Sequence, residues 1–189
     1  MGETTPDYLF HPHAAKRMAK VIPQARLIVL LRNPVDRAYS HYHHNLTRKG
    51  RETLGFEEAI EAEEARLCGE TDKMLEDEHY TSYNWLHFSY LSRSIYVDQL
   101  LRWSKFYGRE QMLVLKSEHF FERPLETLKL VLDFLDLPDW EPETWEIHKI
   151  HNKGHYEPEM DLATRQRLED FFESHNRRLY EYLGVDFGW

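Results

Sequence analysis

The order of apolar and polar residues along the chain predicts short strands separated by helices. An apolar run, LIVLL at residues 27–31, stops at a charged Arg32, and a second short run, MLVL within residues 111–115, lies between polar residues. Short apolar runs bounded by polar residues are typical of buried strands. Strands that alternate with helices pack into a parallel sheet, so the pattern indicates an α/β fold.

Helices are predicted where apolar residues recur every three or four positions. The glutamate-rich positions of segment 56–67 are expected to face solvent. Segment 69–89 has no clear period and is expected to be a long loop with a short helix at residues 72–77. The predicted helices cover residues 13–20, 34–49, 56–67, 92–107, 124–135 and 162–182.

The turn after the first strand carries the strongest functional signal. Asn33 is a good helix N-cap, and Pro34 is tolerated at the first helical position. Arg32 therefore lies at the carboxyl end of a strand, beside helix N–H donors, where anionic ligands bind in open α/β sheets. Ser40 projects away from the apolar stripe of the helix, so its hydroxyl can share a phosphate with Arg32. The alternative is a solvated Ser40 and an ion pair between Arg32 and Asp36.

Four segments resemble a known family. RNPVDRAYSHY, residues 32–42, is similar to the sulfotransferase segment that binds the 3′-phosphate of 3′-phosphoadenosine 5′-phosphosulfate (PAPS). Residues 100–138 resemble the family's helix–strand–helix stretch, and HNKGHY at residues 151–156 resembles the Lys-Gly loop that closes over the nucleotide. The ending, HNRRLYEYLGVDFGW, is similar to the final helix and aromatic tail of the heparan-sulfate-type branch and its bacterial relatives. The resemblance covers nearly the whole chain.

The resemblance implies a fold, a reaction and a set of binding residues. The fold is a three-layer α/β/α, P-loop-NTPase-like sulfotransferase domain with a parallel sheet. The reaction transfers a sulfuryl group from PAPS to a hydroxyl or amine by in-line displacement, and it needs no metal. Arg32 and Ser40 would hold the 3′-phosphate, and Lys153 with Gly154 would cover the nucleotide. His155 stands where the family commonly has Arg and is a smaller donor whose charge depends on pH.

The catalytic base implied by the resemblance is Glu3. GETTPDYL, residues 2–9, resembles the family's Glu-Lys-Thr/Ser-Pro-x-Tyr segment, whose Glu is the proposed base in the heparan-type branch. Thr4 replaces the usual Lys, so one positive charge near the sulfuryl group is absent. The alternatives are that Glu3 belongs to a frayed terminus and that one of the twelve histidines, which titrate near neutrality, is the base.

The family's first strand and P-loop-like turn, which grip the 5′-phosphosulfate, have no counterpart in this sequence. The resemblance therefore implies a single, N-terminally incomplete sulfotransferase domain over residues 1–189. In the family the first strand lies inside the sheet. We therefore expect an exposed apolar edge beside the position of that strand.

Composition narrows the class of partner. The net charge of −9 argues against nucleic-acid binding and makes a highly sulfated polyanion a less natural acceptor. The acceptor is therefore expected to be another carbohydrate or a small molecule. The single cysteine, Cys68, excludes an intrachain disulfide and, with the bacterial relatives of the matched branch, indicates a cytoplasmic bacterial protein. No apolar run approaches the ~20 residues that span a bilayer.

Clustered histidines raise a metal hypothesis. His41 and His44 are three positions apart on a predicted helix and share a face. No cysteine is near them and no HExxH pattern occurs, so no metal is expected and most histidines are interpreted as surface or packing residues. The clusters are His11/His13, His41/His43/His44 and His148/His151/His155.

Two other functions fit parts of the pattern. The first is a non-catalytic nucleotide-binding or assembly module derived from a sulfotransferase, which would bind the desulfonated nucleotide (PAP) without turnover. The second is a nucleotide-kinase-like phosphotransferase. That function needs a Walker loop and Mg²⁺ ligands, and the pattern GxxxxGK[ST] is absent from the sequence.

We predict that the purified chain forms a homo-oligomer, or needs a partner chain, because an exposed sheet edge pairs with other strands. Sedimentation velocity measures this directly. Species larger than the monomer, or poor solubility, are expected. A single monomeric species in clear solution would contradict the prediction.

Overall fold

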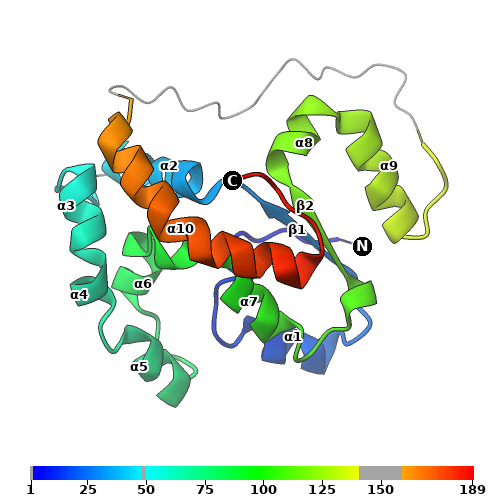
Figure 1. Cartoon of the computed structure of the whole chain (residues 1–189). Coiled ribbons are helices and arrows are strands. Elements are labelled where there is room, and N and C mark those ends of the chain that lie inside the picture. The colour runs from blue at the N-terminus through cyan, green and yellow to red at the C-terminus, as the bar shows by residue number, and fades with distance from the viewer. Residues whose placement is uncertain (1, 48–49, 141–158) are drawn as a thin grey trace.

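The computed structural model describes residues 2–47, 50–140 and 159–189. Two strands of this part pair in parallel, β1 (Leu27–Leu31) with β2 (Met112–Lys116) (Figure 1). The predicted α/β fold with a parallel sheet is therefore confirmed. The bounds of β1 are those predicted from the sequence, and β2 is shifted by one residue.

Helices make up most of the described chain, and Figure 1 shows α10 running across the molecule from α2 to the strand pair. No helix among the described residues is both long and apolar enough to cross a membrane. The α-helices are α1 (Ala14–Val21), α2 (Pro34–Thr47), α3 (Phe56–Glu61), α4 (Glu63–Leu67), α5 (Glu70–Glu76), α6 (Tyr83–Phe88), α7 (Tyr96–Trp103), α8 (Ser117–Glu122), α9 (Pro124–Phe134) and α10 (Leu162–Leu183), with 3-10 turns η1 (Ser92–Ser94) and η2 (Arg109–Gln111).

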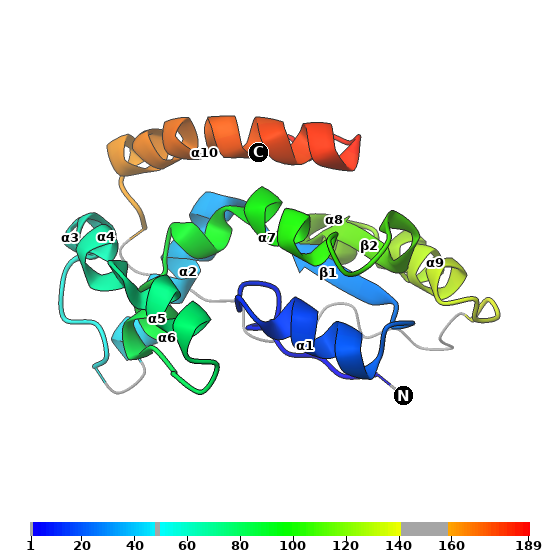
Figure 2. The same cartoon turned by 90° about the horizontal axis from the view of Figure 1, so that it is seen from below.

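The strand pair has one covered face and one open face. Val29 and Leu31 of β1 belong to an apolar cluster with residues of α7 and α10. Side chains alternate between the faces of a strand, and on the other face Ile28 and Leu30 are 37% and 49% exposed. The expectation of a fully buried strand is therefore wrong for this face. Figure 2 shows α10 on one side of the strand pair and α1 on the other, where α1 packs near the amino end at Leu27.

A second apolar core joins α2, α3 and α10. Ala38, Ala59 and Phe172 are completely buried in it. The small alanine side chains let the three helices approach closely, and aromatic rings fill the space between them. This core fixes the start of α10 over α2, so the turn that begins α2 lies on a rigid support.

The segment 69–89 folds into α5 and α6. The first lies close to the short helix predicted at residues 72–77, whereas the predicted loop is wrong where α6 forms. The Glu70 carboxylate accepts hydrogen bonds from Lys73 at 2.7 Å and from Tyr80 at 2.8 Å, and it also bonds the Ser82 hydroxyl. Ser82 in turn caps α6 by accepting the Trp85 N–H at 3.0 Å. Polar contacts between distant residues thus order a segment that has no apolar period.

The predicted helix 92–107 is also interrupted, since η1 precedes α7. The buried Glu63 carboxylate accepts the backbone N–H groups of Leu91 at 2.6 Å and Ser92 at 2.8 Å. Burial raises the pKa of Glu63, although these hydrogen bonds oppose that effect. The expectation that all glutamates of segment 56–67 face solvent is therefore wrong at Glu63, which binds the η1 turn.

A second buried carboxylate, Glu52, holds the loop before α3. It is 2% exposed and accepts two hydrogen bonds from Arg66, at 2.6 and 3.1 Å, and one from the Tyr90 hydroxyl at 2.8 Å. The backbone N–H groups of Thr53 and Leu54 also donate to it, at 2.9 and 3.1 Å. Burial alone would raise the pKa of Glu52, but these hydrogen bonds lower it to about 2.

Replacing Glu52 with Gln is expected to destabilise the fold in a pH-dependent way. The folded-state pKa lies below the ordinary value of 4.5, so ionised Glu52 stabilises the fold by roughly 3 kcal/mol above that pH. This contribution is lost as the pH falls from 4.5 toward 2. Urea unfolding at about pH 7 and about pH 3 should show a large loss for Glu52→Gln at the higher pH and a smaller one at the lower.

The matched control is Glu64→Gln, because Glu64 is an exposed carboxylate on the neighbouring helix α4. Its free energy of unfolding is expected to stay within about 0.5 kcal/mol of the wild type. An equal loss for Glu52→Gln at both pH values would contradict the role assigned to its charge.

Candidate active site

Arg32 follows the buried Leu31 at the carboxyl end of β1. Leu31 is 1% exposed, whereas the Arg32 side chain is exposed. The Arg32 backbone carbonyl accepts a hydrogen bond from the Tyr96 hydroxyl at 2.9 Å, which ties the strand end to α7. Burial raises the pKa of Tyr96 to about 12, so this hydroxyl remains a donor at neutral pH.

Asn33 caps α2, as the sequence predicts. Its Oδ1 accepts the N–H groups of Val35 at 3.0 Å and Asp36 at 3.2 Å, and its carbonyl accepts the N–H of Arg37 at 2.9 Å. The Asn33 N–H donates to the Glu118 carboxylate of α8 at 2.8 Å. The turn is thus bonded to both α2 and α8. The exposed cation of this turn is the Arg32 side chain.

Lys116 places a second cation at the same edge. It lies opposite Leu31 in the strand register and ends β2. Its Nζ donates to the Phe187 carbonyl at 2.5 Å and lies 5.9 Å from the centroid of the Trp189 ring. Sequence reasoning missed Lys116, although a cation directly after an apolar run is the same signal that singles out Arg32.

Ser40 is partly buried on α2. At ~1.5 Å per residue it lies about 9 Å along the helix axis from Pro34. The Arg32 side chain must therefore extend along the helix for both residues to contact one phosphate. The shared contact with one phosphate stays a prediction.

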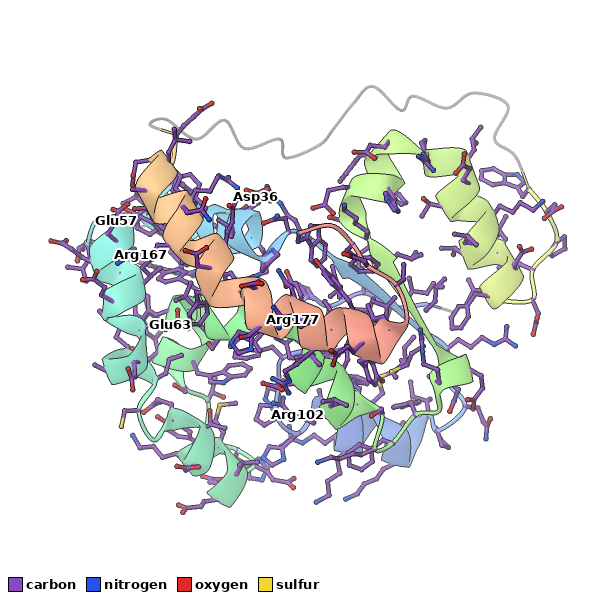
Figure 3. The ribbon with its side chains drawn as sticks, in the orientation of Figure 1. Asp36, Glu57, Glu63, Arg102, Arg167 and Arg177 are labelled. Atoms are coloured by element: carbon purple, nitrogen blue, oxygen red, sulfur yellow. The ribbon has the colours of Figure 1, made fainter. Side chains whose placement is uncertain are left out.

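The alternative ion pair between Arg32 and Asp36 is not the one that forms. In the described chain Asp36 pairs with Arg165 of α10, with Nη2 and Oδ1 separated by 2.6 Å. Figure 3 shows Asp36 on α2, close to α10. This ion pair joins α10 to the first turn of α2, next to the Arg32–Asn33 turn.

Arg37 is a supporting residue that sequence reasoning did not identify. Its guanidinium is buried, donates to Ser94 Oγ at 2.5 Å and bonds the Tyr90 carbonyl. Burial lowers the pKa of Arg37 to about 10, and the charge of Arg32 contributes to the same effect. Arg37 therefore stays protonated at neutral pH and holds the η1 turn against α2.

Glu3, the predicted base, contacts its own segment. Its carboxylate accepts hydrogen bonds from the Tyr8 hydroxyl at 2.7 Å and from Thr5 Oγ1 at 3.3 Å. The bond to Glu3 raises the pKa of Tyr8. Figures 1 and 2 show the N-terminus nearer to the Leu27 end of β1 than to the end from which α2 continues. The base role of Glu3 stays a prediction.

The predicted nucleotide-covering residues Lys153, Gly154 and His155 lie outside the described residues. The histidine cluster around residues 148–155 lies outside them as well. Their predicted contacts with the donor therefore stay predictions from sequence resemblance.

Two histidines of α2, His41 and His43, pack against aromatic rings. Burial lowers the pKa of His41 to about 2, and the positive charge of Arg37 adds to the effect. The His41 ring meets the edge of Tyr90 with centroids 5.0 Å apart. Among the described residues, no three histidine, cysteine, aspartate or glutamate side chains lie close enough together to hold a metal ion.

A cavity of about 260 Å³ adjoins the Arg32–Asn33 turn. Its walls come from the start of α2, from one side of α10 and from the C-terminal tail. The position of the cavity next to the strand-end turn makes it part of the candidate site. Its lining residues are Asn33, Pro34, Val35, Gln166, Glu169, Asp170, Phe172, Glu173, Asn176 and Trp189.

Comparison with known proteins identifies the family. Residues 7–158 match the family described as "Sulfotransferase domain". A sulfotransferase structure from Alicyclobacillus acidocaldarius is similar to this chain with a TM-score of 0.73 and 33% identity, covering 96% of this chain and 63% of that one. The chain belongs to the sulfotransferase domain family, which confirms the resemblance found in the sequence.

Curated relatives are more distant. The chain is 27% identical to bifunctional heparan sulfate N-deacetylase/N-sulfotransferase 1 of Caenorhabditis elegans over 96% of its length, 26% identical to membrane-associated sulfotransferase kil1 of Dictyostelium discoideum over 100%, and 24% identical to human heparan sulfate glucosamine 3-O-sulfotransferase 5 over 99%. It spans 22%, 53% and 56% of these relatives' own lengths.

The Asn33 cap is expected to contribute about 1 kcal/mol to the free energy of unfolding. Asn33→Ala removes the oxygen that accepts two helix N–H groups, whereas Asn33→Ser keeps an accepting oxygen. Urea unfolding should therefore show a lower free energy of unfolding for Asn33→Ala and a value close to the wild type for Asn33→Ser. Equal destabilisation by both replacements would contradict the capping role.

Proposed function

We propose that this chain is a PAPS-dependent sulfotransferase domain that acts on a hydroxyl or amine of a carbohydrate or small-molecule acceptor. The observation that supports this most is the exposed Arg32 at the carboxyl end of a parallel strand, directly before the capped 14-residue helix α2. Such an edge binds anionic groups. Because the chain belongs to the sulfotransferase domain family, the anion expected at this edge is a sulfated nucleotide.

In the proposed reaction the acceptor oxygen or nitrogen forms a bond to sulfur. The bond between sulfur and the 5′-phosphate oxygen breaks, and PAP leaves with the electron pair. The acceptor's proton passes to a base, for which we propose Glu3. Charge that develops on the leaving 5′-phosphate requires cations or N–H groups beside it, and the fixed position of the donor keeps it in line with the acceptor.

Each proposed binding residue has a distinct part. Arg32 and Ser40 hold the 3′-phosphate through a planar guanidinium and a hydroxyl donor. Lys153, Gly154 and His155 cover the nucleotide, as the sequence resemblance implies. The backbone of the Arg32–Asn33 turn is fixed by Tyr96, Asn33 and Glu118, and the Arg32 side chain contacts the ligand.

A carbohydrate acceptor is supported by the names of the relatives, two of which act on heparan sulfate. The chain's net charge of −9 favours an acceptor that is not itself a dense polyanion. A cytoplasmic location rests on the single cysteine and on the resemblance to bacterial relatives, and it stays a prediction, while one relative is named a membrane-associated protein.

Arg32→Ala is expected to weaken PAP binding about thirtyfold, because it removes charge-assisted hydrogen bonds worth about 2 kcal/mol. Ser40→Ala removes one neutral donor, so a loss of about fivefold is expected. Isothermal titration calorimetry with PAP measures both dissociation constants. Wild-type affinity in the Arg32→Ala variant would contradict the proposed phosphate site.

The matched control is Arg26→Ala. Arg26 precedes the opposite end of the same strand and pairs there with Asp136 and the Phe134 carbonyl. It carries the same charge as Arg32, so a general electrostatic effect would weaken PAP binding equally in both variants. A site at the carboxyl edge leaves PAP binding by Arg26→Ala unchanged.

A further inference from the structure

The segment that contains α1 is basic, although the whole chain is acidic. Residues 8–35 contain five lysine and arginine side chains and no aspartate or glutamate, in a chain whose net charge is −9. Residues 99–109, which include the second half of α7 and the loop after it, contain three more and again no acid. The two segments meet in an apolar cluster that contains Ala15, Trp103 and Tyr107. Two basic segments that are far apart in the sequence therefore lie side by side (Figure 1).

Hydrogen bonds also join the loops that follow α1 and α7. The Tyr107 hydroxyl donates to the Ile22 carbonyl at 3.2 Å, and the Gln111 carboxamide donates to the Pro23 carbonyl at 2.9 Å. The outer side of α1 and these two loops thus form one continuous surface. This surface, the α1 face, consists of residues 16–22 and 102–110.

The α1 face carries a net positive charge. Arg17 pairs with Glu78, with Nη2 and Oε2 separated by 3.6 Å, but five other cations have no carboxylate partner among the described residues. Two of the five are arginines that donate to neutral backbone carbonyls. The acid of this face is the exposed Glu110, so cations outnumber it clearly. The five cations are Lys16, Lys20, Arg102, Lys105 and Arg109.

Large apolar side chains project from the same face. Val21 is 79% exposed, Ile22 is 49% exposed and Phe106 is 41% exposed. Residues four positions apart share one side of a helix, so Val21 lies on the outer side of α1 with the exposed Arg17. Apolar surface in water is unfavourable. The α1 face therefore combines unpaired cations with apolar side chains that the described chain does not cover.

We propose that the α1 face binds the surface of an anionic lipid bilayer. The lysine ammonium groups bind phosphate headgroups, and Val21, Ile22 and Phe106 enter the boundary between headgroups and acyl chains. Electrostatic attraction and apolar burial add to each other at such a boundary. A soluble polyanion would pair with the cations but would leave the three apolar side chains in water, so it fits the face less well.

The α1 face lies away from the proposed phosphate site. β1 begins at Leu27, which packs in the same cluster as α1, and it ends at Leu31, next to Arg32. At ~3.3 Å per residue the two ends of the strand are about 13 Å apart. A bilayer on the α1 face thus leaves the carboxyl edge open, and the inference does not depend on the proposed function.

The test is co-sedimentation of the purified chain with lipid vesicles at about 0.1 M salt. Vesicles of equal parts phosphatidylglycerol and phosphatidylcholine are compared with vesicles of phosphatidylcholine alone. The chain is expected to bind the anionic vesicles about tenfold more tightly. At about 1 M salt, where the Debye length falls to ~3 Å, this preference should disappear. Equal binding to both kinds of vesicle at low salt, or binding to neither, would overturn the proposal.

A matched pair of control residues is present on α9, which lies apart from α1 in Figure 1. Lys129 is exposed there, and the next residue, Leu130, is 53% exposed. Lys20→Glu should weaken binding to anionic vesicles about tenfold, whereas Lys129→Glu makes the same charge change and should have no effect. Val21→Ser should weaken it about fivefold, whereas Leu130→Ser should not. Equal losses in both members of either pair would overturn the proposal.

Two further measurements separate a bilayer from other partners. PAP titration of Lys20→Glu is expected to give the wild-type affinity, and a loss would place the α1 face in the nucleotide site and overturn the proposal. Binding of a heparin oligosaccharide that Lys20→Glu abolishes, without binding to anionic vesicles, would also overturn it and indicate a polyanionic partner. Thermal unfolding confirms that each variant is folded.

Discussion

The parallel pairing of β1 with β2 is the constraint on which the candidate site depends. Because Leu31 lies opposite Lys116, both strands end at one edge, where Lys116 is the last residue of β2 and Arg32 follows β1. The Tyr96 hydroxyl fixes the Arg32 carbonyl, and Glu118 fixes the N–H of Asn33. The backbone of the turn is therefore set by strand register and by two distant side chains, independently of any ligand.

Buried polar contacts hold the helices around this edge. Glu63 accepts two backbone N–H groups of the η1 region, and Arg37 donates to Ser94 of η1. A buried charge without partners is costly, so these contacts favour one arrangement of α2 and α7. The Asp36–Arg165 ion pair then adds α10 to the same arrangement. These contacts around α2 explain why the exposed Arg32 starts from a fixed position of the backbone.

Elements with a strong local signal could be predicted from the sequence. The apolar run of β1, the Asn33 cap and the start of α10 were all found in this way, because each depends on neighbouring residues alone. The helix α6 was not predicted, since its order depends on Glu70, which contacts Tyr80 and Ser82, whereas α5 lies close to the short helix predicted at residues 72–77. In the candidate site, the position of Arg32 could be predicted from the residues next to it. The proposed roles of Glu3 and Lys153 could not be tested in this way, because they depend on how distant segments meet around a ligand.

The site also shows why overall charge is a poor guide to the ligand of a small pocket. A chain with a net charge of −9 presents two cations at the ends of its parallel strands, and electrostatic interactions between exposed charges fade beyond about 8 Å at physiological salt. Glu169, Asp170 and Glu173 of α10 line the neighbouring cavity together with Trp189, whose ring centroid lies 5.9 Å from Lys116 Nζ. The sign of the charge at a small site is therefore set by the few side chains that line it, and the net charge of the whole chain does not reveal it.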